Sequence, residues 1–175
     1  MHVMTAITIA YGSRFGSTAK LAEKIAVGLR SVGAATQLID VGEKTLIVPQ
    51  PLVILSAIIW DRPVPVMREW IRANMSLVRQ CTIACGVVCG SAGVREGGGL
   101  IYARQLAKRI GKPDVFQFAL SGEVPPRSRL RPWEWWALQV FAAIMRKPQL
   151  FGIHADAVKA IEVGQKIGRS KTIAV

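Results

Sequence analysis

Short apolar runs alternate along the chain with longer segments in which apolar residues recur at helical spacing. The apolar runs predict strands, and they lie at residues 6–11, 35–41, 52–57, 81–89 and 115–120. The segments between them predict amphipathic helices at 18–33, 65–75 and 100–110, and a further helix is expected at 155–167. Because parallel strands need crossover helices, five strands alternating with four helices predict a doubly wound α/β fold.

One segment, residues 122–153, interrupts this alternation between the fifth strand and the last helix. At about 30 residues it is too long for an ordinary connection, which indicates a functional or separately structured insertion. The chain has 175 residues, a length that suits one ordinary domain. We therefore expect residues 1–175 to form a single domain that carries this insertion.

The loop after the first strand has residue types suited to phosphate. Gly12 and Gly16 permit tight turning, Ser13, Ser17 and Thr18 offer hydroxyls, and the next helix presents unpaired N–H groups. The spacing fits neither G-x-x-x-x-G-K-[ST] nor G-x-G-x-x-G. A plain glycine turn with Ser17 or Thr18 as the helix N-cap explains the same residues. On residue types alone, both interpretations stay open.

The run YGSRFGST, from Tyr11 to Thr18, resembles the phosphate loop of flavodoxins. The order of strands and helices agrees with that family over essentially the whole chain. The resemblance implies a flavodoxin-like five-stranded parallel sheet of order 2-1-3-4-5 and a noncovalently bound FMN. The FMN phosphate would then lie among Ser13, Arg14, Phe15, Gly16, Ser17 and Thr18. In that arrangement Arg14 either neutralises phosphate charge or points to solvent.

The same resemblance implies that two later loops hold the flavin ring. After the third strand, Ala57 and Ile58 would line the ring and Trp60 would stack on it. The alternative for Trp60 is packing against the helix that starts at Pro65. After the fourth strand, backbone groups for the pyrimidine edge would come from Gly90, Ser91, Ala92 and Gly93. The tyrosine that flavodoxins commonly supply there is absent, which disfavours a simple electron carrier.

The charge of the chain narrows its partners. Lys and Arg number 23 against 11 Asp and Glu, a net charge of +12, so anionic partners are expected. Nucleic acid, an acidic membrane surface and a phosphorylated ligand all qualify. Part of the excess gathers in the insertion, where Glu134 is the one acidic residue from Arg127 to Lys147 against Arg127, Arg129, Arg131, Arg146 and Lys147.

Between these basic ends the insertion reads WEWWALQVFAAIM, from Trp133 to Met145. As a helix it would be about 20 Å long, too short to span a bilayer. Tryptophans at one end and basic residues at both ends suit a helix that lies in a membrane interface, and contact with an anionic membrane or a quinone is the favoured interpretation. Packing in the core or in a homodimer is the alternative. The nearly uninterrupted apolar run disfavours nucleic acid.

A basic segment with tryptophans, placed between the fifth strand and the last helix, is similar to the bacterial quinone-dependent protoporphyrinogen oxidases, a flavodoxin-fold branch of haem biosynthesis. The resemblance implies an FMN-dependent oxidoreductase that passes electrons from a reduced substrate, such as protoporphyrinogen, to a quinone or another acceptor. The chain departs from that branch at residues 151–156 and in the glycine-rich stretch 93–99. Two alternatives remain: a flavodoxin-like module without flavin that docks to a membrane or partner, and a soluble flavodoxin electron carrier.

The remaining chemically active residues give weaker indications. Cys81, Cys85 and Cys89 stand four apart on an expected strand, so neighbouring thiols would lie roughly 13 Å apart and could not share a metal. We expect no metal site and three buried thiols. His154 is expected at the surface rather than as a proton donor. Because no signal peptide, membrane-spanning run or disulfide framework is visible, we expect a cytoplasmic protein, peripheral on the inner membrane face if the insertion docks there.

Overall fold

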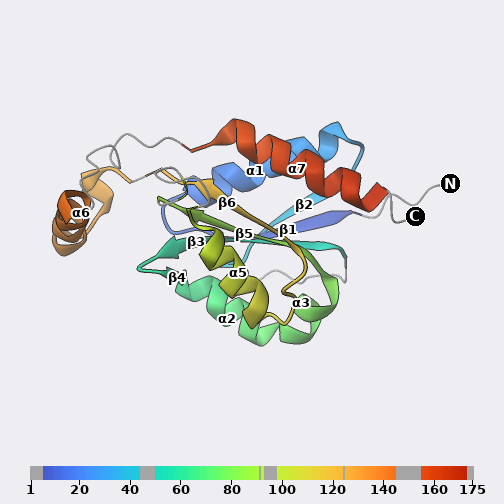
Figure 1. The fold of residues 1–175 in the computed structure, drawn as a ribbon, viewed down its shortest axis with the longest axis horizontal. Helices are drawn as coiled ribbons and strands as arrows, with labels where there is room; N and C mark the ends of the chain where they lie inside the picture. The colour runs from blue at the N-terminus through green and yellow to red at the C-terminus, as the bar shows by residue number, and fades with distance from the viewer. Residues whose placement is uncertain are drawn as a thin grey trace.

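The computed structural model describes residues 6–43, 50–90, 92, 98–123, 125–144 and 155–172. Its centre is a parallel sheet with helices on both faces (Figure 1). The sheet follows the path β2-β1-β3-β5-β6. These strands are β1 (Ile7–Gly12), β2 (Thr36–Asp40), β3 (Leu52–Ile59), β5 (Thr82–Cys89) and β6 (Phe116–Ser121). Counted along the chain, the parallel strands stand in the order 2-1-3-4-5, which confirms the predicted doubly wound fold.

A short hairpin extends β3 beyond the parallel sheet. The two-residue strand β4 (Arg62–Pro63) pairs antiparallel with β3, with Ile58 opposite Pro63. Trp60 and Asp61 connect the two strands, and their φ angles are 51° and 60°. Two consecutive left-handed residues define a type I′ turn, for which Asn and Gly are the usual choices. This hairpin could not be predicted from the sequence, because Trp-Asp is not a usual turn pair.

The helices divide between the two faces of the sheet (Figure 1). On one face α1 (Ser17–Ser31) and α7 (Ala157–Thr172) lie side by side. A Cβ atom on Gly28 of α1 would stand 2.1 Å from the Ile161 carbonyl oxygen, and one on Gly164 of α7 would stand 2.2 Å from the Ile25 carbonyl oxygen. Only glycine allows the two helices to approach this closely, and α1 is thereby fixed over the sheet.

The other face carries α2 (Pro65–Ala73), α3 (Met75–Cys81) and α5 (Leu100–Arg109). Cys81 is not part of the fourth strand, where it was expected, because it ends α3 and the strand begins at Thr82. The boundary has a local cause, since the Thr82 hydroxyl donates to the Val78 carbonyl and ties the last turn of α3 to the strand. Cys81 is therefore partly exposed, whereas Cys85 and Cys89 are buried as expected.

The insertion contains a 3₁₀ turn, η1 (Arg127–Arg129), and the helix α6 (Pro132–Ile144). Figure 1 shows α6 beyond the edge of the sheet where the strands end, apart from the two helical layers. Its helical conformation agrees with the sequence expectation. Within the described part of the chain, no helix has the length and apolar character to cross a membrane.

Candidate functional site

The carboxyl ends of the strands meet at one edge of the sheet. Gly12 at the end of β1 pairs with Ser56 of β3, Ala57 pairs with Val88 of β5, and Cys89 pairs with Ser121 of β6. The loops after these strands therefore start side by side. Ligands of open α/β sheets bind at this edge, so the fold places the predicted phosphate loop where a ligand is expected.

The loop after β1 forms a tight turn that leads directly into α1. The Gly16 N–H donates to the Ser13 hydroxyl over 3.0 Å, and Gly16 itself has a φ of 92°. Gly16 is the N-cap of α1, and no side chain caps this helix. The alternative in which Ser17 or Thr18 caps the helix is therefore wrong. The first-turn N–H groups of α1 are left for another acceptor.

Ser17 and Thr18 have different surroundings at the start of α1. The Ser17 hydroxyl accepts a hydrogen bond of 3.1 Å from the Glu123 N–H, just after β6. Thr18 is only 1% exposed and lies beneath the loop. Ser17 is only partly buried, and its hydroxyl can donate to a ligand oxygen while it accepts from the Glu123 N–H.

The insertion folds onto this same loop. The Arg14 Nη1 atom lies 2.7 Å from the Glu134 Oε1 atom, and Glu134 is 4% exposed. The Arg129 Nη1 atom donates to the Phe15 carbonyl over 3.5 Å. The Arg14 guanidinium also lies over the Phe15 ring, 4.7 Å from its centroid. Arg14 is therefore paired with a buried carboxylate and does not simply point to solvent.

Glu134 has a second role at the start of α6. Its Oε2 atom accepts a hydrogen bond of 2.9 Å from the Arg131 N–H, which precedes Pro132 at the first helical position. This is the carboxylate half of a capping box. Burial raises the pKa of Glu134, but the hydrogen bonds from the Arg131 N–H and the Arg14 guanidinium outweigh it and hold the pKa below its ordinary value. The carboxylate is charged at neutral pH.

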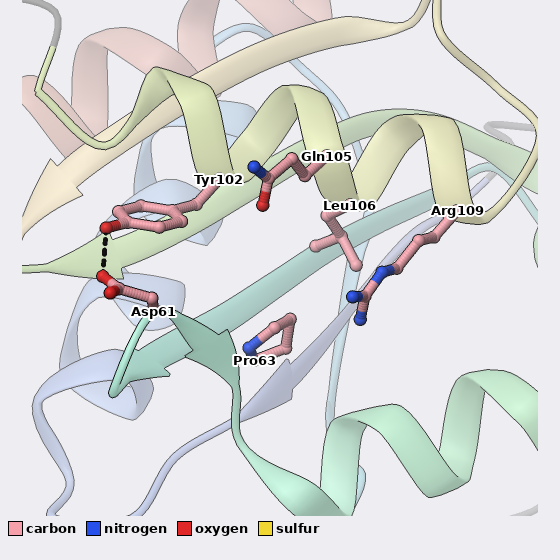
Figure 2. Close-up of a pocket in the computed structure, with 6 residues that line it drawn as sticks. All are labelled: Asp61, Pro63, Tyr102, Gln105, Leu106 and Arg109. Carbon is pink, nitrogen blue, oxygen red and sulfur yellow. Dashed lines mark hydrogen bonds between the residues drawn. The ribbon is translucent and has the colours of Figure 1, made fainter.

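Trp60 projects from the tip of the β3–β4 hairpin. The next residue, Asp61, accepts a hydrogen bond from the Tyr102 hydroxyl of α5 (Figure 2). This hydrogen bond and burial raise the pKa of Tyr102 to about 12. A small groove between the hairpin and α5 is lined by Asp61, Pro63, Tyr102, Gln105, Leu106 and Arg109 (Figure 2). The hairpin is thus anchored to α5 through Asp61.

The ring of Trp60 stacks on Trp133 of α6, with centroids 5.8 Å apart and an interplanar angle of 19°. The sequence alternatives, a flavin platform or packing on α2, did not include this partner. Both indoles are 53% exposed. The stacked pair lies at the same edge of the sheet as the loop after β1, which the insertion contacts through Glu134 and Arg129.

The structure describes only some of the other residues that were predicted to contact the flavin ring. Ala57 and Ile58 are partly buried against the side of the sheet that α2 and α5 cover. Gly90 and Ala92 are partly exposed at the end of β5. Several predicted positions lie outside the described residues: Ser91, Gly93, Gly97, Arg146, Lys147 and His154.

Two serines that the sequence analysis did not select also lie at this edge. Ser56 is fully buried beside Gly12, and its hydroxyl donates to the Ala57 carbonyl over 3.0 Å. Ser121 is 7% exposed, and its hydroxyl has no hydrogen-bond partner within the described part of the chain. The available signal was similar for both, a hydroxyl at or near the carboxyl end of an expected apolar strand. A buried hydroxyl without a partner suits a site that receives a polar ligand.

An open parallel sheet of this order, with an uncapped helix after a hydroxyl-containing turn, defines a flavodoxin-like fold. Similar structures include a flavodoxin from Archaea (TM-score 0.56, 14% identity, 94% of this chain and 97% of that chain). Others are oxidised flavodoxin 1 of Bacillus cereus (0.56, 12%, 94% and 98%) and the Flv1 flavodiiron core of Synechocystis (0.59, 11%, 99% and 38%). No protein-family model and no curated protein matches the sequence. At such identities the likeness establishes the fold, and it gives no support to the protoporphyrinogen oxidase branch.

Proposed function

We propose that this chain binds FMN at the carboxyl edge of its sheet and acts as a flavin-dependent oxidoreductase. The observation that carries the proposal is the start of α1, which lacks a side-chain cap and follows directly on the Ser13–Gly16 turn. A phosphate there would accept from the first-turn N–H groups and lie at the positive end of the helix dipole. The flavodoxin-like fold supports FMN as the phosphate-bearing group.

Four residues at this edge of the sheet have defined roles in the proposed site. Ser13 and Ser17 give hydroxyls to the phosphate, and Arg14 shares its charge between the phosphate and Glu134. Trp60 provides a planar apolar surface for the ring. Bound FMN supplies the hydride or single-electron chemistry, and the protein binds and orients it. As the finer proposal, the reduced substrate is a porphyrinogen and the acceptor a quinone, on the resemblance of the insertion to that branch.

The removal of both loop hydroxyls should weaken FMN binding selectively. In S13A/S17A we expect the dissociation constant of FMN to rise roughly 10-fold, because two hydrogen bonds to a charged group are lost. Riboflavin, which has no phosphate, should bind as it does to the wild type. Quenching of flavin fluorescence measures both. The control is S128A, which removes an exposed hydroxyl from η1. A wild type that quenches neither flavin would refute the proposed function.

The outer side of α6 supports a second part of the proposal, docking to an anionic membrane. Trp136 and Ile144 are 69% and 74% exposed, whereas Glu134, the one acidic residue of the helix, faces inward. Arg127, Arg129 and Arg131 are exposed just before it. A helix that faces water exposes its charged residues and buries its apolar ones, whereas α6 does the opposite. This arrangement suits a membrane interface, in which indoles contact lipid headgroups and arginines contact lipid phosphates.

Charges on this face should abolish membrane binding. We expect the wild type to sediment with phosphatidylglycerol-containing vesicles and W136E/I144E to remain in solution, because both carboxylates would have to enter the interface. The matched control is I101E/V158E, which changes two exposed apolar residues on α5 and α7. Equal sedimentation of the two variants would contradict docking through α6. If light scattering instead showed a dimer that only W136E/I144E disrupts, α6 would be a homodimer contact.

A further inference from the structure

The contact between Trp60 and Trp133 joins two segments that are distant in the sequence. Trp60 stands at the tip of the β3–β4 hairpin and Trp133 in the first turn of α6. The two indoles are nearly parallel and form a stacked pair. Half of each remains exposed, so the pair is covered by little else and a ligand can reach it. Two planar surfaces that face each other are suited to a third planar surface.

The separation of the pair shows what a ligand would require. Stacked aromatic rings have planes about 3.5 Å apart, so a ring held between two indoles needs their planes about 7 Å apart. The centroid distance of 5.8 Å is that of an offset pair already in contact, so entry of a third ring requires the indole planes to separate by about 3.5 Å more. Such a ligand would replace one stacking contact by two, which compensates for the separation of the indoles.

The same turn of α6 also reaches the other end of the site. Glu134 follows Trp133 directly and is held by Arg14, which belongs to the loop after β1. The position of Trp133 is thus set by a contact with the loop that would hold the phosphate. Between Gly90 and Gly99 the sequence contains no aromatic residue, so the loop after β5 has none to place on a ring.

We infer that the first turn of α6 forms the outer wall of the flavin site, with Trp133 as a ring-binding residue opposite Trp60 and Glu134 as the residue that positions it. This inference rests on the proposed binding of FMN. It gives the insertion a role inside the site, in addition to its outer apolar face. The site then selects a large planar ring that carries a phosphate, since two consecutive residues of α6 contact Trp60 and the loop after β1.

Trp133 can be tested with Trp136 as its matched control, because Trp136 lies in the same helix with its ring largely exposed. In W133L we expect the dissociation constants of FMN and riboflavin to rise by the same factor, about 10-fold, since the ring is common to both. Leucine preserves apolar packing but offers no plane for stacking. In W136L both constants should stay within about 2-fold of the wild type.

The emission of bound flavin gives an independent readout, because an indole in contact with a flavin ring quenches its fluorescence. At saturating FMN, bound flavin should be brighter in W133L than in the wild type and unchanged in W136L. If the wild type binds FMN and W133L matches W136L in both measurements, Trp133 does not touch the ring, and the proposed function still stands. If the wild type binds neither flavin, the proposed function fails and this inference fails with it.

Discussion

In the charge-reversal variant R14E, the dissociation constant of FMN is expected to rise about 100-fold, and that of riboflavin by no more than about 10-fold. The new carboxylate would repel the phosphate and would also stand beside Glu134, which would lose the Arg14 guanidinium that helps to hold its pKa below the ordinary value. FMN loses both the phosphate contact and the positioned first turn of α6. Riboflavin loses only the second, so the ratio of the two constants isolates the phosphate. Fluorescence titration at moderate salt measures both.

The control for this experiment is K20E, the same reversal on α1. Lys20 is exposed and pairs with Glu123 over 3.3 Å, a surface contact of little energetic value. Because its charge is screened by solvent, we expect FMN affinity to change by less than about 5-fold. Equal losses in R14E and K20E would mean that net charge, and not the contact of Arg14, determines the affinity.

In the variant G28V, the free energy of unfolding is expected to fall by about 3 kcal/mol. A Cβ atom at this position would stand 2.1 Å from a backbone oxygen of α7, and backbone cannot move aside as a flexible side chain can. Separation of α1 and α7 would uncover the apolar core between these helices and the sheet. Urea unfolding followed by circular dichroism measures the change at constant m-value.

K24V provides the comparison for G28V, since it places the same side chain on the exposed side of α1. There the valine meets only solvent, and the expected loss is below about 0.5 kcal/mol. A G28V variant as stable as K24V would show that the two helices separate without cost, contrary to the packing described above.

Hydrophobic periodicity predicted the layered fold because most elements bury a regular set of positions. Leu52 to Leu55 are fully buried, as a continuous apolar run between two helical layers requires. The failures occurred where local chemistry overrides the pattern. The boundary at Cys81 was predicted wrongly, because a seven-residue helix and a buried strand have similar short apolar runs in the sequence. The β3–β4 hairpin has no turn signal in its residues.

The tight turn between β1 and α1 could be predicted because all of its residues are consecutive, and its binding of phosphate stays a prediction. The partners of that loop could not, since Glu134 and Arg129 reach it only after the chain has folded. In the sequence Glu134 is merely one acidic residue in a basic segment. Trp133 and Trp136 are indistinguishable there as well, although in the structure one stacks on Trp60 and the other remains largely exposed.

The two-residue turn at Trp60 and Asp61 determines which side of the site can adjust. A two-residue turn between paired strands has little conformational freedom, and Asp61 is hydrogen-bonded to the Tyr102 hydroxyl. The backbone at Trp60 is therefore held by the pairing of β3 with β4 and by the contact of Asp61 with α5. Trp133 belongs to a helix outside the two helical layers, so any change in the spacing of the indoles must come from α6 (Figure 1). A ligand bound against Trp60 would then change the orientation of α6. Binding at the site would in this way alter the position of the outer apolar face that we expect to contact lipid.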